Sequence, residues 1–319
     1  MMTTRFVALG DSITAGFGDP MPDGSWRGWA ALLAEALGPP GSVEFHNLAV
    51  SGALTGTVVR DQLPRALELR PTVAAVLVGV NDTLRASFDV AALSAAVIET
   101  VAALHRVGAL VLTARLPEPG RMLGLPAGLA RPLARRIDVV NAVFDHAAQR
   151  FGTVHFDAAS HPETYRSSMW SVDRLHPSER GHRLLAGSYA DLLAARGHPV
   201  YARPDPKPGN PPPTRRQQLA WLAVKGTRWV RDRCTDLVPQ LLWMATVESW
   251  HRLGGRARRL DERLTRELAS ALAATDQADA AIGRTRSRTT VPPSAAATPA
   301  PRSPRPHPPA PLPDGQNTA

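Results

Sequence analysis

The chain has 319 residues, a formal net charge of +9 and one cysteine, Cys234. This length allows one sizeable α/β domain with additional material, and a lone cysteine excludes an intramolecular disulfide. The charge does not indicate a nucleic-acid-binding domain, because residues 1–200 carry 18 Arg, no Lys and 18 acidic residues and are neutral. The positive surplus lies in residues 201–319, which lack a nucleic-acid-binding motif. A basic DNA-binding protein is therefore the weakest alternative, and we expect no nucleic-acid partner.

The sequence shows no sign of membrane insertion or export. No window approaches the ~18 consecutive apolar residues of a membrane-spanning helix. The N-terminus also lacks a basic region followed by a long apolar stretch, as a cleavable signal peptide would have. We therefore expect a cytoplasmic protein.

Short β-branched runs alternate with longer helical patterns through residues 1–200. The expected strands are Arg5–Leu9, Val43–Leu48, Val73–Val78, Ala109–Thr113 and Val154–Asp157. The expected helices are Gly28–Leu37, Thr55–Leu69, Val90–Val107, Ile137–Phe151 and Glu179–Arg196. The third strand is apolar on both faces, as in a parallel sheet that helices cover on both sides. The alternation predicts an α/β fold, a doubly wound three-layer α/β/α sandwich with a five-stranded parallel sheet.

Beyond residue 197 the composition changes, so we place the end of the first domain, residues 1–197, there. Residues 198–213 hold seven prolines and are expected to form a Pro-rich linker. Residues 214–270 regain helical periodicity and predict a basic, Trp-containing helical extension. Residues 285–319 are rich in Pro, Ser and Arg with few large apolar side chains, which predicts a disordered tail.

The extension carries four of the seven tryptophans, interleaved with Arg and Lys. They are Trp221, Trp229, Trp243 and Trp250. One interpretation is a helical hairpin that packs back on the first domain, since Pro239 breaks the segment and acidic residues interrupt its basic face. The other is contact of residues 214–266 with an anionic membrane surface, because Trp and Arg on amphipathic helices suit the lipid headgroup region.

Four short motifs lie just beyond expected strands or before the last expected helix. They are Gly10-Asp11-Ser12, Ser51-Gly52, Gly79-Val80-Asn81-Asp82 and Asp173-Arg174-Leu175-His176-Pro177. Taken singly, each also fits an ordinary turn, loop or helix start. Taken together, they supply a hydroxyl, a histidine with a carboxylate three residues before it, an exposed glycine N–H and an amide donor. These are the groups that acyl transfer requires, and the carboxyl edge of a parallel sheet would bring them together.

In these four motifs, residues 5–196 resemble the SGNH hydrolase superfamily, also called GDSL lipases and esterases. The resemblance implies a flavodoxin-like sandwich and an ester hydrolase. It assigns Ser12 as the nucleophile, His176 as the base and Asp173 as the residue that orients it. It also assigns the oxyanion hole to the N–H groups of Ser12 and Gly52 and to the Asn81 side chain. Ile13 stands where the family name has Leu, a common variant.

The expected activity is hydrolysis of small or lipid-like carboxylic esters through an acyl-enzyme. A carbohydrate O-acetyl esterase is an alternative within the same chemistry, and a non-catalytic binding module on the same fold is an alternative of another class. We expect no cofactor and no metal, since the sequence has no HExxH, dinucleotide-binding or P-loop motif. The partner is a small-molecule ester, and the oligomeric state is open.

Two segments bear on the substrate. Trp26 and Trp29 lie on the first expected helix, beside the nucleophile motif. We expect them to belong to the core, and contact with the substrate is the alternative. Residues Pro117–Arg136 mix Pro and Gly with large apolar side chains and are too irregular to predict one helix. They follow the fourth strand, so they are expected to form either a flap over the site or a surface excursion.

Overall fold

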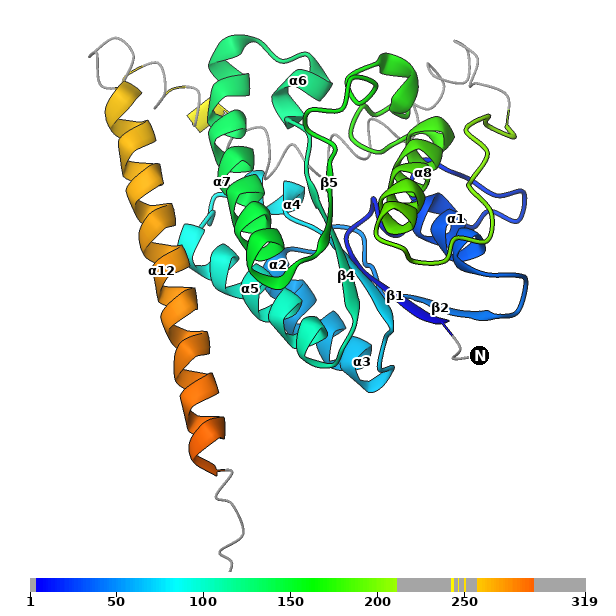
Figure 1. Cartoon of the computed structure of the whole chain (residues 1–319). Coiled ribbons are helices and arrows are strands. Elements are labelled where there is room, and N and C mark those ends of the chain that lie inside the picture. Colours follow the sequence, from blue (N-terminus) through cyan, green and yellow to red (C-terminus); the bar gives the residue numbers. More distant parts are fainter. Residues whose placement is uncertain (1–3, 211–241, 244–245, 247–249, 251–256, 290–319) are drawn as a thin grey trace, which may run out of the picture. The chain divides into compact units, whose positions relative to one another are not determined.

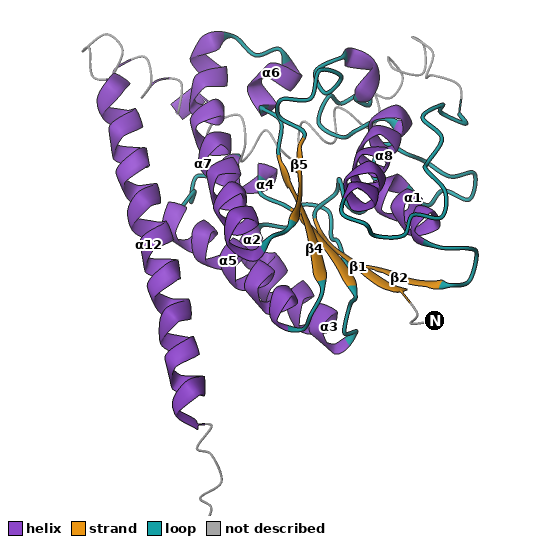
Figure 2. Ribbon diagram, viewed as in Figure 1, coloured by secondary structure: helices purple, strands orange, loops and turns teal. Residues whose placement is uncertain are grey.

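The computed structural model describes residues 4–210, 242–243, 246, 250 and 257–289. Its centre is a sheet of strands β1 (Thr4–Gly10), β2 (Val43–Asn47), β3 (Val73–Leu77), β4 (Leu110–Arg115) and β5 (Val154–Asp157). The strand order is β2-β1-β3-β4-β5, and every neighbouring pair is parallel (Figure 2). The predicted fold class is confirmed, with strand ends within two residues of those expected.

Helices cover both faces of the sheet (Figure 1). Among the described residues, the helices are α1 (Gly28–Leu37), α2 (Thr55–Thr57), α3 (Leu63–Glu68), α4 (Val80–Thr83), α5 (Val90–Arg106), α6 (Pro119–Leu123), α7 (Ala127–Phe151), α8 (Glu179–Ala195) and α12 (Ala257–Thr289). A π-helical turn, Val58–Gln62, joins α2 to α3, and a 3₁₀ turn, Ser167–Met169, precedes α8. Helices α1 and α8 pack on one face, while α3, α5 and α7 pack on the other.

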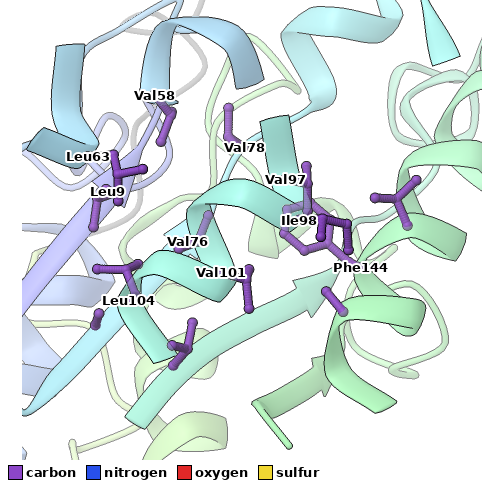
Figure 3. Close-up of a cluster of buried hydrophobic side chains, with 14 of the residues drawn as sticks. Leu9, Val58, Leu63, Val76, Val78, Val97, Ile98, Val101, Leu104 and Phe144 are labelled. Atoms are coloured by element: carbon purple, nitrogen blue, oxygen red, sulfur yellow. The ribbon is translucent and has the colours of Figure 1, made fainter. Parts of the chain in front are cut away.

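Alternation along the strands divides the core into two layers. In β1, Phe6 and Ala8 face α1 and α8, whereas Val7 and Leu9 face α5 and α7. Figure 3 shows part of the second layer, where α5 contributes Val97, Ile98, Val101 and Leu104. Successive side chains of a strand point to opposite faces, so a strand buried on both faces is apolar at every position, as β3 is.

Side-chain caps fix the starts of two long helices. The Asp89 carboxylate accepts a hydrogen bond from the Ala92 N–H at 2.9 Å and begins α5. The Ser178 hydroxyl accepts from the Gly181 N–H at 3.4 Å and begins α8 directly after the His176 motif. Such caps satisfy N–H groups that have no partner within the helix, so α8 starts at a defined distance from His176.

The predicted start of α7 is wrong. The helix begins at Ala127, ten residues before the expected Ile137, and includes Pro132. Proline lacks the N–H that would bond four residues back and usually disfavours a helix interior. Here the buried Leu133 and Ile137 pack into the core and keep the segment helical. The irregular region is therefore short, limited to α6 and the residues around it.

The Pro-rich segment lies against the first domain as far as it is described, through Asn210. Arg203 pairs with Asp191 of α8 at 2.8 Å. The Glu179 carboxylate accepts from the N–H groups of Gly209 and Asn210 at 2.6 and 2.9 Å. Burial would raise the pKa of Glu179, but these hydrogen bonds and Arg183 lower it to about 2. Residues 198–210 are therefore held by specific contacts.

Helix α12 runs past residue 270, where we expected the extension to end. Its last five residues belong to the segment 285–319 that the sequence predicted to be unstructured. Leu264, Leu268 and Ala271 pack with Val90 of α5 and Val139 of α7. This part of the extension therefore packs on the first domain. Most of the expected helical hairpin lies outside the described residues.

Charged pairs accompany that packing. Asp261 of α12 pairs with Arg135 of α7 at 2.5 Å. Asp276 contacts Arg150, also of α7, and lies 3.0 Å from His146 Nε2. Most of residues 214–256 lie outside the described part, so the domain boundaries there and the membrane contact stay predictions. Trp243 and Trp250, which are described, are 65% and 73% exposed.

Among the described residues, none of the helices has the length and apolar character needed to cross a membrane. The cytoplasmic location stays a prediction.

Candidate active site

The site lies at the carboxyl edge of the sheet, where strand order reverses. Strands β1 and β3 are neighbours and their connections leave in opposite directions, because β2 lies on one side and β4 on the other. Ser12 follows β1, and Asn81 follows β3 in the first turn of α4. In open α/β sheets this reversal leaves space for ligands outside the strand ends. The topology therefore places the Ser12 and Asn81 motifs side by side.

Hydrogen bonds join all four predicted motifs. The Val50 N–H donates to Gly10 O at 3.2 Å, connecting the loop of Gly52 to the end of β1. Thr55, beyond Gly52, donates its N–H and its hydroxyl to the Asp82 carboxylate at 3.2 and 2.7 Å. The fourth motif reaches the first through His176, as described next. The structure thus brings together every site residue that the sequence predicted.

Ser12, His176 and Asp173 form one hydrogen-bonded chain. Ser12 Oγ lies 2.8 Å from His176 Nε2, and His176 Nδ1 lies 2.6 Å from Asp173 Oδ2. An ionised carboxylate only accepts hydrogen bonds, so Nδ1 carries the proton and donates it to Asp173. Nε2 is then the acceptor for the Ser12 hydroxyl. This is the tautomer that a base acting on Ser12 requires.

A tight turn fixes the Asp173 carboxylate. Its second oxygen, Oδ1, accepts from the Ser171 hydroxyl at 2.6 Å and from the N–H groups of Leu175 and His176 at 2.9 and 3.0 Å. Burial would raise the pKa of Asp173, but the hydrogen bonds from His176 and Ser171 and the positive charge on His176 lower it to about 2. Asp173 is therefore ionised near neutral pH.

Arg174 gives this turn its shape. It has a φ of +57°, in the left-handed region that side-chain-bearing residues rarely adopt. The Ser171 N–H donates to His176 O at 2.8 Å and closes the turn around it. Strain of this kind is typical of functional sites, where surrounding contacts hold it in place. The turn lets Asp173 and His176 point the same way.

The three predicted oxyanion donors come from the turn of Ser12, the loop of Gly52 and the first turn of α4. Gly52 has a φ of +82°, which favours glycine and leaves no Cβ beside its N–H. Asn81 Nδ2 lies 3.3 Å from Asp11 Oδ2 and 3.2 Å from Ala53 O, and both partners only accept. These two acceptors fix the orientation of the amide, with its nitrogen toward the residue before Ser12 and the residue after Gly52. Both bonds are longer than the usual ~2.9–3.0 Å for a nitrogen donor and an oxygen acceptor.

Asp11, which precedes the nucleophile motif's serine, is a buried carboxyl without a predicted role. Its Oδ1 accepts from the Ile13 N–H at 3.0 Å, so it shapes the turn that carries Ser12. Burial raises the pKa of Asp11 to about 6, opposed by the Ile13 hydrogen bond and by the charge of His176. Asp11 therefore couples the Ser12 turn to the Asn81 amide.

Two further supporting residues were missed from the sequence. Gln62, buried in the π-helical turn, accepts from the Gly10 N–H at 2.8 Å and donates to Gly10 O at 2.9 Å. Asp82 holds Thr55, and burial raises its pKa. Asp82 belongs to a motif that the sequence identified, so its type and position were a usable signal. Gln62 gives no such signal in the sequence, because only the tertiary structure brings it close to Gly10.

The model of the GDSL-like Lipase/Acylhydrolase family matches residues 8–184, more than half of the chain. The chain belongs to the GDSL-like Lipase/Acylhydrolase family. A comparison with curated protein sequences returned no match.

Solved structures are similar to part of the chain, and one of them has a TM-score above 0.5. A protein from Parabacteroides merdae described as a GDSL-like lipase has a TM-score of 0.51 at 16% identity, over 60% of this chain and 96% of its own. A lipase/acylhydrolase from Enterococcus faecalis has a TM-score of 0.47 at 19% identity, over 65% of this chain and 100% of its own. An acetyl xylan esterase from Geobacillus stearothermophilus has a TM-score of 0.49 at 16% identity, covering 60% and 94%. Identities this low concern the fold alone.

The two tryptophans near the site of this GDSL-like protein differ in environment. Trp29 is fully buried and packs against Tyr189, with ring centroids 5.2 Å apart, as expected. Trp26 is 43% exposed, so its assignment to the core is wrong. It stacks on Phe17, which in turn contacts the ring of His176. A tryptophan just before a helix start has no periodic neighbours to show its direction, so the sequence could not separate the two.

The predicted flap region forms α6 and the first turns of α7. Helix α6 lies beyond the carboxyl end of β4 (Figure 1). Arg121 stacks over the Tyr165 ring at 3.7 Å, and the Tyr165 hydroxyl oxygen accepts from the Glu118 N–H at 3.2 Å. Met122 is buried. Whether this segment closes over a substrate stays a prediction.

Proposed function

We propose that the chain is a serine ester hydrolase with Ser12 as nucleophile, His176 as general base and Asp173 as the group that orients the base. The observation that carries the proposal is the unbroken Ser12–His176–Asp173 hydrogen-bond chain at the strand-order reversal. Membership of the acylhydrolase family supports the reaction class. A binding module that had lost catalysis would not need this tautomer-fixing arrangement.

The acylation step follows from the geometry. His176 Nε2 takes the Ser12 hydroxyl proton as Oγ attacks the ester carbonyl carbon, and negative charge moves to the carbonyl oxygen. That oxygen would be stabilised by the N–H groups of Ser12 and Gly52 and by Asn81 Nδ2. When the carbon–oxygen bond to the alcohol breaks, His176 passes its proton to the leaving oxygen, and the acyl group remains on Ser12.

Deacylation uses the same groups with water as the nucleophile. His176 Nε2 takes a proton from water, hydroxide adds to the acyl carbon, and Ser12 leaves with the proton from His176. Asp173 stays ionised throughout, since its pKa is about 2. Its role is to hold the ring and to stabilise the imidazolium that forms transiently.

We infer small or lipid-like carboxylic esters as the substrates, with carbohydrate O-acetyl esters as the second candidate. The exposed Trp26 favours the second candidate, because aromatic faces pack well on sugar rings. A panel of nitrophenyl esters of increasing acyl length, together with acetylated sugars, distinguishes the two. Ser12→Ala is the control, and its kcat should fall by roughly 10⁴–10⁶. Comparable activity in Ser12→Ala protein would refute the assignment of the nucleophile.

A further inference from the structure

A stacked aromatic pair extends outward from the catalytic histidine. The Phe17 ring centroid lies 5.5 Å from that of His176, and the Trp26 ring stacks on Phe17 at 5.0 Å with an interplanar angle of 19°. Phe17 is half-buried, while Trp26 is 43% exposed. Ligand-binding sites are lined mainly by apolar and aromatic side chains, so an exposed tryptophan beside a reactive group fits a role in substrate binding. Nothing in the catalytic mechanism uses this pair.

The pair is built on a rigid support. Trp26 lies at the end of the Pro20–Trp26 hairpin, in which the two named residues pair as an antiparallel bridge. The Met21 N–H donates to Ser25 O at 2.9 Å across it. At its base, the fully buried Asp19 binds Arg27 Nε at 2.9 Å. A side chain on a rigid hairpin is already held in place. It therefore loses little conformational entropy when it binds a ligand.

The residues just before the hairpin are held against the His176 motif and helix α8. A Cβ at Gly18 would lie 1.9 Å from Pro177 O, so the chain passes directly against the His176 motif. His182 Nε2 donates to Phe17 O at 2.8 Å, and its Nδ1 accepts from the Trp29 N–H at 3.1 Å. Burial lowers the pKa of His182 to about 4, which favours this neutral tautomer at neutral pH. Phe17 therefore keeps its position beside His176.

The chemistry of His176 says which part of an ester meets the pair. His176 must reach the leaving oxygen to protonate it, so the alcohol portion lies beside the imidazole and the acyl portion lies on the oxyanion side. Phe17 and Trp26 contact the histidine side of the site. They therefore face the alcohol and offer it a flat apolar surface. The guanidinium of Arg27, the residue after Trp26, is paired with Asp19 and Glu179.

We propose that Trp26, backed by Phe17, is a specificity-determining residue that stacks on a ring in the alcohol portion of the ester. The proposal rests on the ester hydrolase function above and extends it to a substrate class: esters whose alcohol carries a flat-faced ring next to the ester oxygen. An aromatic ring and a sugar ring share this chemistry. The acyl group is not selected by this surface.

The test compares matched ring and chain esters. Benzyl acetate and hexyl acetate differ in the alcohol, whereas ethyl phenylacetate and ethyl heptanoate place the same contrast in the acyl group. In Trp26→Ala the benzyl-to-hexyl ratio of kcat/KM should fall by about three- to tenfold, the size of one aromatic stacking contact. The ratio for the two ethyl esters should not change. Trp26→Phe should restore most of the alcohol preference, and Trp26→Leu should not.

Tyr201→Ala is the control variant. Tyr201 is 61% exposed, and its N–H donates to Ala36 O near the C-terminal end of α1. The substitution therefore removes an exposed ring that lies away from the active site. Both ratios should stay at the wild-type value in this variant. A 6-O-acetyl glucoside and benzyl acetate, compared in Trp26→Ala, show whether the ring is a sugar or an aromatic, since the larger loss marks the preferred ring.

Binding to Ser12→Ala protein separates this proposal from the proposed function. NMR titration of benzyl and hexyl acetate against Ser12→Ala and Ser12→Ala/Trp26→Ala measures the ring preference without turnover. If wild-type protein hydrolyses no ester, the proposed function is refuted. The ratio of the Kd values for benzyl and hexyl acetate still tests the role of Trp26. Equal ratios with and without Trp26, or a change confined to the acyl pair, would overturn the role of Trp26 in binding the alcohol.

Discussion

Asp173→Asn tests the proposed mechanism by replacing one carboxylate oxygen with an NH₂ group. In the structure, Asp173 Oδ1 accepts three hydrogen bonds, from the Ser171 hydroxyl and from the N–H groups of Leu175 and His176. An asparagine in the same place keeps those bonds only if its oxygen occupies the Oδ1 position. Its NH₂ group then faces His176 Nδ1, where the carboxylate had accepted a hydrogen bond at 2.6 Å.

The consequence is a change of tautomer. Because the amide donates, His176 Nδ1 must accept, and the single imidazole proton moves to Nε2. Nε2 then donates to Ser12 Oγ and cannot take its proton. We expect kcat to fall by about 10⁴-fold, equivalent to about 5 kcal/mol of transition-state stabilisation.

The assay is hydrolysis of p-nitrophenyl acetate by wild type, Asp173→Asn and Asp173→Ala under identical conditions. Asp173→Asn should be at least as impaired as Asp173→Ala, because the amide enforces the wrong tautomer whereas alanine leaves Nδ1 free to find water. Thermal unfolding shows whether both variants are folded. Asp173→Asn that keeps more than about a tenth of wild-type kcat would refute the proposed role of Asp173.

Three further outcomes are expected. Asn81→Ala should lower kcat by roughly 10²–10³ with a smaller change in KM, since an oxyanion donor acts only in the transition state; a pure KM effect would instead assign Asn81 to substrate binding. The pKa of Glu179 lies near 2, below its usual 4.5, so its carboxylate stabilises the fold above pH 4.5 and that contribution is lost as the pH falls through 2. Glu179→Gln should therefore cost about 2 kcal/mol at pH 7, allowing for solvent screening, and almost nothing near pH 2, as measured by urea unfolding; an equal loss at both pH values would contradict the ionic origin. Vesicles of anionic lipid should sediment the chain at low but not high salt, whereas no binding at low salt would exclude contact of residues 214–266 with the membrane surface.

The sheet could be predicted because its signals are local. A strand such as Val73–Leu77, buried on both faces, is apolar at every position, and its neighbours along the chain are helical patterns that force parallel pairing. The start of α7 could not be predicted, since Pro132 argues against a helix and only packing of Leu133 and Ile137 outweighs it. Local propensity was overridden by tertiary contacts.

The residues of the site also separate into those that the sequence could predict and those that it could not. Ser12, Asn81 and the Asp173–His176 pair sit at strand ends and one helix start, so motif and topology together locate them. Asp11 and Gln62 act through hydrogen bonds that link distant parts of the chain, and sequence spacing carries no trace of those bonds. The exposure of Trp26 likewise depends on how the Pro20–Trp26 hairpin folds, which its composition does not reveal.

Covalent labelling tests the central claim most directly. Diethyl p-nitrophenyl phosphate transfers its diethylphosphoryl group to an activated serine and releases nitrophenolate, and peptide mass spectrometry then locates the adduct. The account predicts one modified residue, Ser12, with labelling lost in Ser12→Ala and strongly slowed in His176→Ala. An adduct on another residue, or labelling that persists in Ser12→Ala, would contradict it.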